Sequence, residues 1–155
     1  STRIVLLRGY NEEGLVFYTN YNSDKAVELL AQPKTELNFF WPQLQRQMRI
    51  RGTISKVDTK TSDEYFATRP RASQISAWAS NQSSQIDSRS ELEQNMQSYL
   101  KKFEGKDVPR PENWGGLRLT PNRFEFWQGR LSRLHDRLVY TLQDDKSWEV
   151  KRLSP

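Results

Sequence analysis

The segments typical of β-strands follow one another along this chain without regular alternation with helices, and this most limits its possible folds. Parallel strands need a long crossover, usually a helix, between them, whereas antiparallel strands can be joined by short turns. Helical patterns are concentrated in the middle of the chain, and strand-like runs lie on both sides. We therefore predict a mainly β (α+β) fold, an antiparallel barrel with peripheral helices, as a single domain over residues 1–155.

The strands are predicted from short runs rich in apolar, β-branched and aromatic residues. The first two runs, RIVLLR and LVFYT, are separated by GYNEEG, which is typical of a hairpin loop. Near the C-terminus, DDK predicts a tight turn between the last two strands. The predicted strands cover 3–8, 15–19, 35–41, 46–57, 117–120, 123–129, 136–143 and 147–153.

The helices are predicted from apolar periodicity and from residues that cap or end a helix. Ser23 and Ser73 are candidate N-caps, and Pro70 ends the helix before it. Leu92, Met96 and Leu100 recur every four residues, as on one face of a helix. The predicted helices cover 20–32, 62–70, 73–80 and 88–103.

Composition excludes several classes of site. The chain has no cysteine and one histidine, which excludes disulfides, thiolate metal sites, cysteine nucleophiles and histidine-rich metal sites, so we expect no metal. No apolar run approaches the roughly 18 residues of a membrane span. The lack of cysteine is compatible with a reducing compartment, and we expect a cytoplasmic protein. A net charge of +5 favours an anionic partner, although it is also compatible with an ordinary solvated surface.

The stretch WQGRLSRLHDR contains the only histidine and several cations. If it is extended, Arg133, His135 and Arg137 project from one face, where they repel one another unless something anionic or electron-rich lies against them. Trp127 can pack on a flat ring, Arg133 can stack on another, and His135 can supply a hydrogen bond or proton near neutral pH. The alternative is a capping histidine among surface arginines.

Two further groups of residues could bind phosphate. Arg3 and Arg8 are an odd number of positions apart, so on a regular strand they face opposite sides and could each meet a different anion. Tyr65 and Arg69 are spaced i, i+4 on a predicted helix, and Ser73 begins the next one, which together could clamp a phosphate. Solvated strand ends and an ordinary helix cap are the alternatives.

Several of these motifs occur in the order found in one known family. The segments RIVLLR, FYTNYNSDK, RQ, YFATRPRASQI, NQSS, WGG and EFWQGRLSRLHDR resemble the pyridoxamine (pyridoxine) 5′-phosphate oxidase family over nearly the whole chain. The resemblance implies an FMN-binding split β-barrel that forms a homodimer with FMN at the subunit interface. It also implies oxidation of pyridoxamine or pyridoxine 5′-phosphate to pyridoxal 5′-phosphate in vitamin B6 metabolism, with O₂ as acceptor and H₂O₂ as product.

The resemblance also implies roles for individual residues. Arg3 and Lys25 would hold the FMN phosphate, with Gln82 and Ser83 contributed across the interface. The remaining implied FMN-binding residues are Ile4, Val5, Leu6, Leu7, Arg8, Tyr18, Thr19, Gln47, Trp127 and Arg137. The implied substrate-binding residues are Arg8, Tyr65, Arg69, Ser73, Arg133, Leu134 and His135, of which Arg133 and His135 would be catalytic.

The chain departs from the family pattern in three respects. Arg8 replaces the usual lysine, and Asp24 stands where a basic residue commonly adjoins the flavin phosphate. The third departure concerns the family's N-terminal segment, which supplies the first barrel strand and a lid over the substrate: we expect it to be missing from this chain. Two other functions are retained as alternatives: a non-catalytic flavin or pyridoxal-phosphate binding protein on the same barrel, and a basic barrel that binds RNA or single strands. The basic residues form no continuous track in sequence, so we expect no nucleic acid and no membrane as partner.

Overall fold

The structure is a computed structural model, and it describes residues 2–155. Its centre is a seven-stranded sheet in which every pairing is antiparallel. The strands are β1 (Gly9–Asn11), β2 (Gly14–Asn20), β3 (Lys34–Trp41), β4 (Arg46–Lys56), β5 (Trp114–Gln128), β6 (Asp136–Leu142) and β7 (Trp148–Leu153). The helices are α1 (Asp24–Ala31), α2 (Thr59–Ala67), α3 (Arg71–Ala79) and α4 (Arg89–Lys102), with two short 3₁₀ turns, η1 (Pro42–Leu44) and η2 (Leu131–Arg133).

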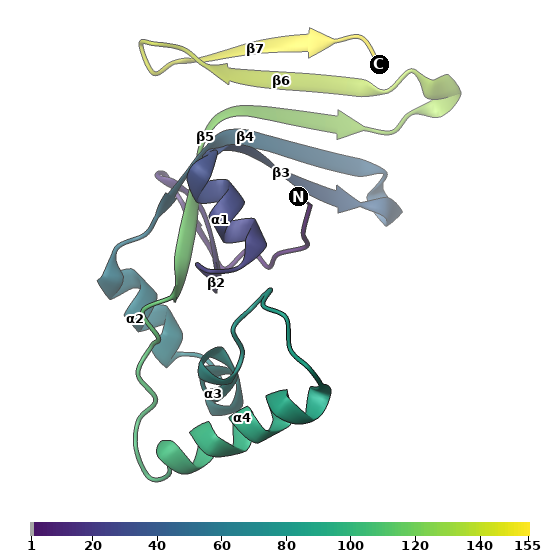
Figure 1. The fold of residues 1–155 in the computed structure, drawn as a ribbon. Coiled ribbons are helices and arrows are strands. Elements are labelled where there is room, and N and C mark those ends of the chain that lie inside the picture. The colour runs from purple at the N-terminus through teal and green to yellow at the C-terminus, as the bar shows by residue number, and fades with distance from the viewer. Residues whose placement is uncertain (1) are drawn as a thin grey trace.

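The long strand β5 divides the sheet into two parts. Its first half pairs with β2, from Trp114 to Leu119, and its second half pairs with β6, from Arg123 to Gln128. On its other side β5 pairs with β4 along its whole length, with a shift in register between Arg51 and Gly52. Pro121 lies at the change of partner, where the lack of a backbone N–H costs no hydrogen bond. The sheet therefore curls, and Figure 1 shows β6 and β7 at the opposite side of the fold from α2 and α3.

Two hydrophobic clusters stabilise the two parts. One lies inside the curled sheet under α1 and includes the fully buried Phe17, Ile50, Leu117 and Leu119. The other joins α2, α3 and α4 to the start of β5 through residues such as Trp114. The functional residues described below lie at the margins of these clusters, where packed backbone fixes their positions.

The element types agree with the sequence predictions in most of the chain, but the first predicted strand is wrong. Residues 2–8 lie outside the sheet, and β1 occupies part of the predicted hairpin loop. Followed toward the N-terminus, the pairing with β2 continues one residue beyond β1, to Arg8, whose backbone N–H donates to the Val16 carbonyl at 2.9 Å. Upstream, Val5 packs on the core and Leu7 lines a cavity beside α1 and β3, so the segment leaves the sheet edge.

Two other predicted boundaries also need correction. Ser23 caps α1 as predicted, but Ser73 does not cap α3, which begins at Arg71 after Pro70. The Ser73 N–H is consequently occupied by the Pro70 carbonyl at 2.8 Å. The predicted strands 117–120 and 123–129 are a single strand, because β4 pairs across the proline between them.

Within residues 2–155, no helix is both long enough and apolar enough to cross a membrane.

Candidate functional site

The predicted site residues fall into three groups, two at the β2 end of the sheet and one at the far end of β5. The first group, called here the Arg3 cluster, consists of Arg3, Thr19, Lys25 and Gln82. Lys25, in the first turn of α1, donates a short hydrogen bond to the Thr19 hydroxyl on β2. The same hydroxyl lies 3.3 Å from the Gln82 Oε1 atom, in the loop after α3. Gln82 reaches this cluster within its own chain, so the cluster does not require Gln82 from a second chain.

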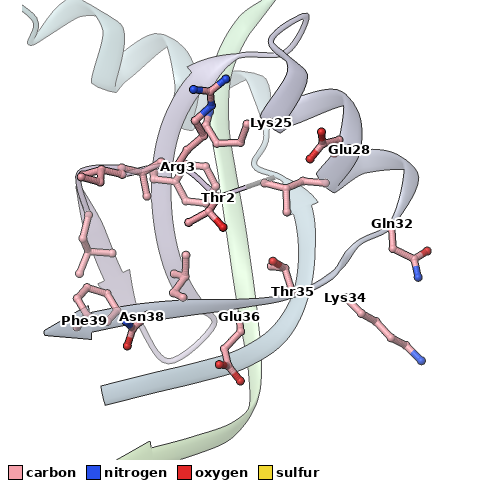
Figure 2. A pocket seen from close by; sticks show the side chains of 16 residues that line it. Thr2, Arg3, Lys25, Glu28, Gln32, Lys34, Thr35, Glu36, Asn38 and Phe39 are labelled. Atoms are coloured by element: carbon pink, nitrogen blue, oxygen red, sulfur yellow. The ribbon is translucent and has the colours of Figure 1, made fainter. Parts of the chain in front are cut away.

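The Arg3 cluster is short of negative charge. Burial lowers the pKa of Lys25, and the positive charge of Arg3 lowers it further. The carboxylate that approaches Arg3 is that of Asp24, at 4.0 Å, and both side chains are more than half exposed. Figure 2 shows Arg3 and Lys25 together at one end of a cavity of about 570 Å³ between the N-terminal segment, α1 and β3. Two adjacent cations with one distant, solvated carboxylate favour binding of a further anion.

The remaining predicted residues near this cluster are less well placed. In the segment Ile4–Leu7, Val5 packs on the core, and Ile4 and Leu7 line the cavity while remaining exposed. Leu6 is exposed and does not line the cavity. Ser83 has a positive φ of 71° in the same loop as Gln82, and its side chain is exposed.

The second group, called the Arg69 cluster, consists of Arg8, Tyr18, Tyr65, Arg69 and Trp114. The rings of Tyr18 and Tyr65 stack with centroids 3.8 Å apart, and the Arg69 guanidinium lies 4.5 Å from the Trp114 ring. Arg69 is not on a helix face with Tyr65 as predicted, because α2 ends at Ala67 and Arg69 lies in the turn before Pro70. The stacked rings nevertheless bring the phenol and the guanidinium into one cluster.

A buried nitrogen of Arg69 has no hydrogen-bond partner. Among the described residues, nothing accepts a hydrogen bond from its Nη1 atom. Burial is the main reason that the pKa of Arg69 is lowered; the Tyr65 phenol opposes this effect and the nearby charge of Arg8 adds to it. An unpaired buried donor is costly, so the cluster is built for an acceptor that comes from outside the chain. Phosphate has the charge and the oxygen atoms to supply it.

A pair of glycines from the WGG motif allows this packing. A Cβ atom on Gly116 would lie 3.0 Å from the Tyr18 ring and 2.6 Å from Val57. A Cβ atom on Gly115 would lie 2.1 Å from the Tyr21 hydroxyl. The β5 backbone can therefore lie directly against the tyrosines of β2, which fixes the stack at Trp114.

The third group is a row of side chains across three strands, called the Trp127 row: Gln47, Trp127 and Arg137. The register pairs Gln47 of β4 with Trp127 of β5, and Trp127 with Arg137 of β6. Directly paired residues project from the same face of a sheet, so the three side chains lie side by side. This row is the direct consequence of strand register.

His135 adjoins the Trp127 row. Its ring centroid lies 4.8 Å from that of Trp127, and its Nδ1 atom accepts a hydrogen bond from the Arg130 backbone N–H at 3.1 Å. An accepting Nδ1 requires that, in the neutral imidazole, the proton is on Nε2. The Nε2–H of His135 is therefore the hydrogen atom that this residue can offer to a ligand.

The cation-rich stretch WQGRLSRLHDR, residues 127–137, is not one extended strand, contrary to the expectation from the spacing of its arginines. Ser132 and Arg133 have positive φ values of 56° and 59°, so η2 interrupts the alternation. Asp136 accepts hydrogen bonds from Arg130 and Arg152, which neutralises part of the charge. Within residues 2–155, Arg133 pairs with no carboxylate; it is exposed, as is Leu134 at 71%.

The Trp127 row lies far from the two cationic clusters of the same chain. Thirteen residues of β5 separate Trp114 from Trp127, which corresponds to about 43 Å along the strand at ~3.3 Å per residue. Figure 1 places η2 and the β5–β6 connection at the other end of the sheet from α2 and α3. A small ligand held by one chain at the Arg3 or Arg69 cluster therefore leaves that chain's own Trp127 row out of reach.

Sequence comparisons identify the family. Residues 2–103 match the family described as pyridoxamine 5′-phosphate oxidase, and residues 114–155 match the pyridoxine 5′-phosphate oxidase C-terminal dimerisation region. The chain belongs to the pyridoxamine 5′-phosphate oxidase family. A relative from Trichormus variabilis, named pyridoxine/pyridoxamine 5′-phosphate oxidase, is 55% identical over all of this chain and 72% of its own length. A relative of the same name from Cupriavidus taiwanensis is 52% identical over all of this chain and 73% of its own length.

Solved structures confirm the predicted fold class. PhzG from Burkholderia lata 383, in complex with tetrahydrophenazine-1-carboxylic acid, superposes with a TM-score of 0.92 at 28% identity, covering 100% of this chain and 75% of that one. A pyridoxamine 5′-phosphate oxidase-related, FMN-binding protein from Nostoc punctiforme superposes with a TM-score of 0.75 over 99% of this chain and 80% of that one. At 18% identity the second likeness shows the fold alone, a split barrel that is mainly β. The family supports FMN as the expected cofactor, and the dimerisation region supports a homodimer.

Proposed function

We propose that this protein is an FMN-dependent oxidase that converts pyridoxamine or pyridoxine 5′-phosphate to pyridoxal 5′-phosphate and passes the electrons to O₂. Curated relatives more than half identical to the chain carry the name of this activity. Both the cofactor and the substrate carry one phosphate, and the chain has two cationic clusters: one in which Arg3 and Lys25 adjoin the solvated carboxylate of Asp24, and one with the unpartnered Nη1 atom of Arg69. The observation that carries the proposal is the buried Nη1 atom of Arg69, beside the Trp114 ring, for which no described residue supplies an acceptor.

The Arg3 cluster fits the phosphate of FMN. Arg3 and Lys25 supply charge, and the Thr19 hydroxyl and the Gln82 amide supply hydrogen bonds. The Trp127 row of a second chain would complete the cofactor site at the subunit interface, because each chain's own row is too far away. In this arrangement each homodimer has two equivalent sites, and each site takes phosphate ligands from one chain and ring contacts from its partner.

The Arg69 cluster fits the substrate phosphate. Arg69 and Arg8 would supply charged donors, and the Tyr65 hydroxyl would supply a third. Ser73 is the third residue of α3, within its first turn, so its hydroxyl, and not its occupied backbone N–H, is the group available to the ligand. Fixing the phosphate at the Arg69 cluster would orient the reactive carbon of the substrate relative to the cofactor.

The residues near η2 would act on the substrate ring. Bound FMN would supply the redox chemistry, as acceptor of a hydride from the C4′ carbon of the substrate, and O₂ would take up the two electrons as one H₂O₂ per turnover. Arg133, exposed and without a carboxylate partner, would cover the ring face opposite the cofactor. His135 would donate from Nε2, with Leu134 placed between them. These three residues would come from the same chain as the Trp127 row that faces the cofactor.

A second candidate follows from the likeness to PhzG, whose printed ligand is a tetrahydrophenazine carboxylic acid. That ligand carries a carboxylate and no phosphate. The two cationic clusters, and Arg69 above all, favour phosphorylated substrates.

Binding and turnover on the purified protein test the proposal. FMN added to the apoprotein should be quenched with a stoichiometry of one per chain, and pyridoxine 5′-phosphate should give pyridoxal 5′-phosphate and H₂O₂ in equal amounts. Pyridoxine without phosphate is the control and should react far more slowly. FMN binding without turnover would favour a non-catalytic binding protein, and no FMN binding would refute the proposal.

A further inference from the structure

A nearly completely buried carboxylate lies next to the Trp127 row and has no role in the function proposed above. Glu125 of β5 is 3% exposed and is surrounded by Arg49, Arg123 and Arg137. Its Oε2 atom lies 3.0 Å from Arg123 Nη2 and 3.7 Å from Arg49 Nη1. Burial on its own raises the pKa of Glu125, but the hydrogen bonds from Arg137 and Arg123 outweigh burial and hold this pKa below its usual range.

The contact with Arg137 is the most specific of these. Arg137 donates from Nε and from Nη2 to the same carboxylate oxygen of Glu125, at 3.0 Å and 2.9 Å. Its Nη1 atom donates to the Ser154 carbonyl at 3.0 Å. All three nitrogens of the guanidinium are therefore engaged, and the plane of the group is fixed before any ligand binds.

Strand register explains why this support lies where it does. Glu125 pairs with Arg49 on β4 and with Val139 on β6, one row along the same face from the Trp127 row. Arg137 belongs to the Trp127 row and leans back onto Glu125. A buried ionic cluster is seldom the most stable way to fill a sheet, since well-packed apolar residues often do so at lower cost. The ionic cluster around Glu125 lies beside the Trp127 row, whose three residues are predicted to bind the cofactor, and this position indicates a role in function.

We propose that Glu125 is a positioning residue that fixes Arg137 against the flavin, an inference that rests on the proposed function. The charges of Glu125 and its surrounding arginines are consistent with this positioning role. Glu36 extends this network from β3 by pairing with Arg49 and Arg51, so four guanidinium groups share two carboxylates. Glu125 therefore orients Arg137 without cancelling the positive charge that this face presents to the cofactor. Such positive charge favours a reduced, anionic flavin.

The test compares two glutamates of the same network. Glu125→Gln removes the charged support of Arg137, whereas Glu36→Gln removes a partner of Arg49 and Arg51 and does not touch Arg137. We expect Glu125→Gln to weaken FMN binding about tenfold and to shift the visible absorption bands of the bound flavin. Glu36→Gln should lower the melting temperature of the apoprotein and change the FMN dissociation constant and spectrum much less than Glu125→Gln does, because Glu36 holds Arg49 and Arg51 and not Arg137.

The outcomes separate this inference from the proposed function. If the wild-type protein binds no FMN, the proposed function fails and the inference fails with it. If the wild type binds FMN and both glutamine variants bind it equally well, with identical spectra, the inference alone is overturned.

A second variant covers the case in which Glu125→Gln does not fold. Glu125→Asp keeps the charge among the arginines but withdraws the carboxylate by one methylene, so its contact with Arg137 lengthens. We expect severalfold weaker FMN binding, compared with a clearly smaller change for Glu36→Asp. Equal affinities for these two aspartate variants would reject the role of Glu125.

Discussion

Arg69 and Arg49, at the two ends of the sheet, have opposite electrostatic surroundings. At the β2 end, Arg69 lies on the Trp114 ring, has a nitrogen without a partner and has a lowered pKa, mainly because burial is not offset by a carboxylate. At the β6 end, Arg49 has a raised pKa, above all because Glu36 accepts its hydrogen bond at 2.6 Å. The same side chain is thus left without a counter-ion in one place and paired in the other.

This difference indicates different tasks for the two ends. A guanidinium without a counter-ion gains most when an external anion arrives, so the β2 end is suited to binding phosphate. A guanidinium already paired gains little from an anion and instead holds a fixed geometry, so the β6 end is suited to orienting a ring. In the function proposed above, a complete site takes one end from each of two chains, because β5 separates these ends by most of its length.

The largest expected effect is at Arg69. Arg69→Met removes the donors for the substrate phosphate, and we expect kcat/KM for pyridoxine 5′-phosphate to fall about a hundredfold or more, roughly 3 kcal/mol. The melting temperature of the apoprotein should not fall by a comparable amount, because a buried charge without a partner is removed together with its desolvation cost. Steady-state kinetics and thermal unfolding measure both quantities.

Arg89→Met is the matched control for Arg69→Met. Arg89 is an exposed cation on α4 that pairs with Glu93 at 2.9 Å, and its loss should leave kcat/KM unchanged. A similar loss in both variants, or loss of FMN binding in Arg69→Met, would contradict the assignment of Arg69 to the substrate phosphate.

A smaller effect is expected in the acid stability of the β6 end. The pKa of Glu125 is lower in the folded state than in the unfolded chain, so its contribution is present above the ordinary glutamate pKa and is lost as pH falls through the folded value. Arg49, Arg123 and Arg137 face this carboxylate and remain charged throughout. We expect wild type to exceed Glu125→Gln in free energy of unfolding by on the order of 2 kcal/mol at pH 7.

The difference between wild type and Glu125→Gln should shrink as the pH is lowered below about 4.5. A protonated glutamic acid is nearly isosteric with glutamine, so the two proteins become equivalent once Glu125 is neutral. Urea unfolding at pH 7, 5 and 4 gives the comparison. A difference that is constant across this range would show that the glutamine variant is destabilised by packing and not by loss of charge.

The sequence predicted local elements well and long-range geometry poorly. The cap at Ser23 and the helix over 88–103 depend on neighbouring residues, and α1 and α4 form where those residues indicate. The Trp127 row depends on register between strands far apart in sequence, which periodicity does not specify. The positive φ values of Ser132 and Arg133 were also unpredictable, because neither residue type favours that conformation.

The resemblance to a family supplied candidate residues, and the structure supplied their grouping. The motifs placed Arg3 and Lys25 together on the FMN phosphate, but they did not indicate that Gln47, Trp127 and Arg137 form one row across three strands. Glu125 was missed altogether, although it lies inside the quoted motif EFWQG. The burial of Glu125 could not be predicted from the sequence, because a charged residue between two phenylalanines is also the ordinary alternation of a strand with one solvated face. The burial depends on the arginines that strand register brings beside Glu125.

The smallest expected effect is at Asp24, whose carboxylate lies 4.0 Å from the Arg3 guanidinium. Asp24→Asn removes a negative charge that competes with phosphate for Arg3, so we expect FMN to bind about two- to fivefold more tightly. The gain should diminish at high salt, because both side chains are largely exposed and their interaction is screened. Riboflavin, which lacks the phosphate, should bind both proteins equally, and Glu93→Gln, which breaks an exposed pair on α4, should change neither affinity. Fluorescence titration with the two flavins measures both affinities. An equal gain in affinity for riboflavin would mean that Asp24 acts through folding of α1. Weaker FMN binding in Asp24→Asn would mean that the carboxylate helps to hold Arg3 in place for the phosphate.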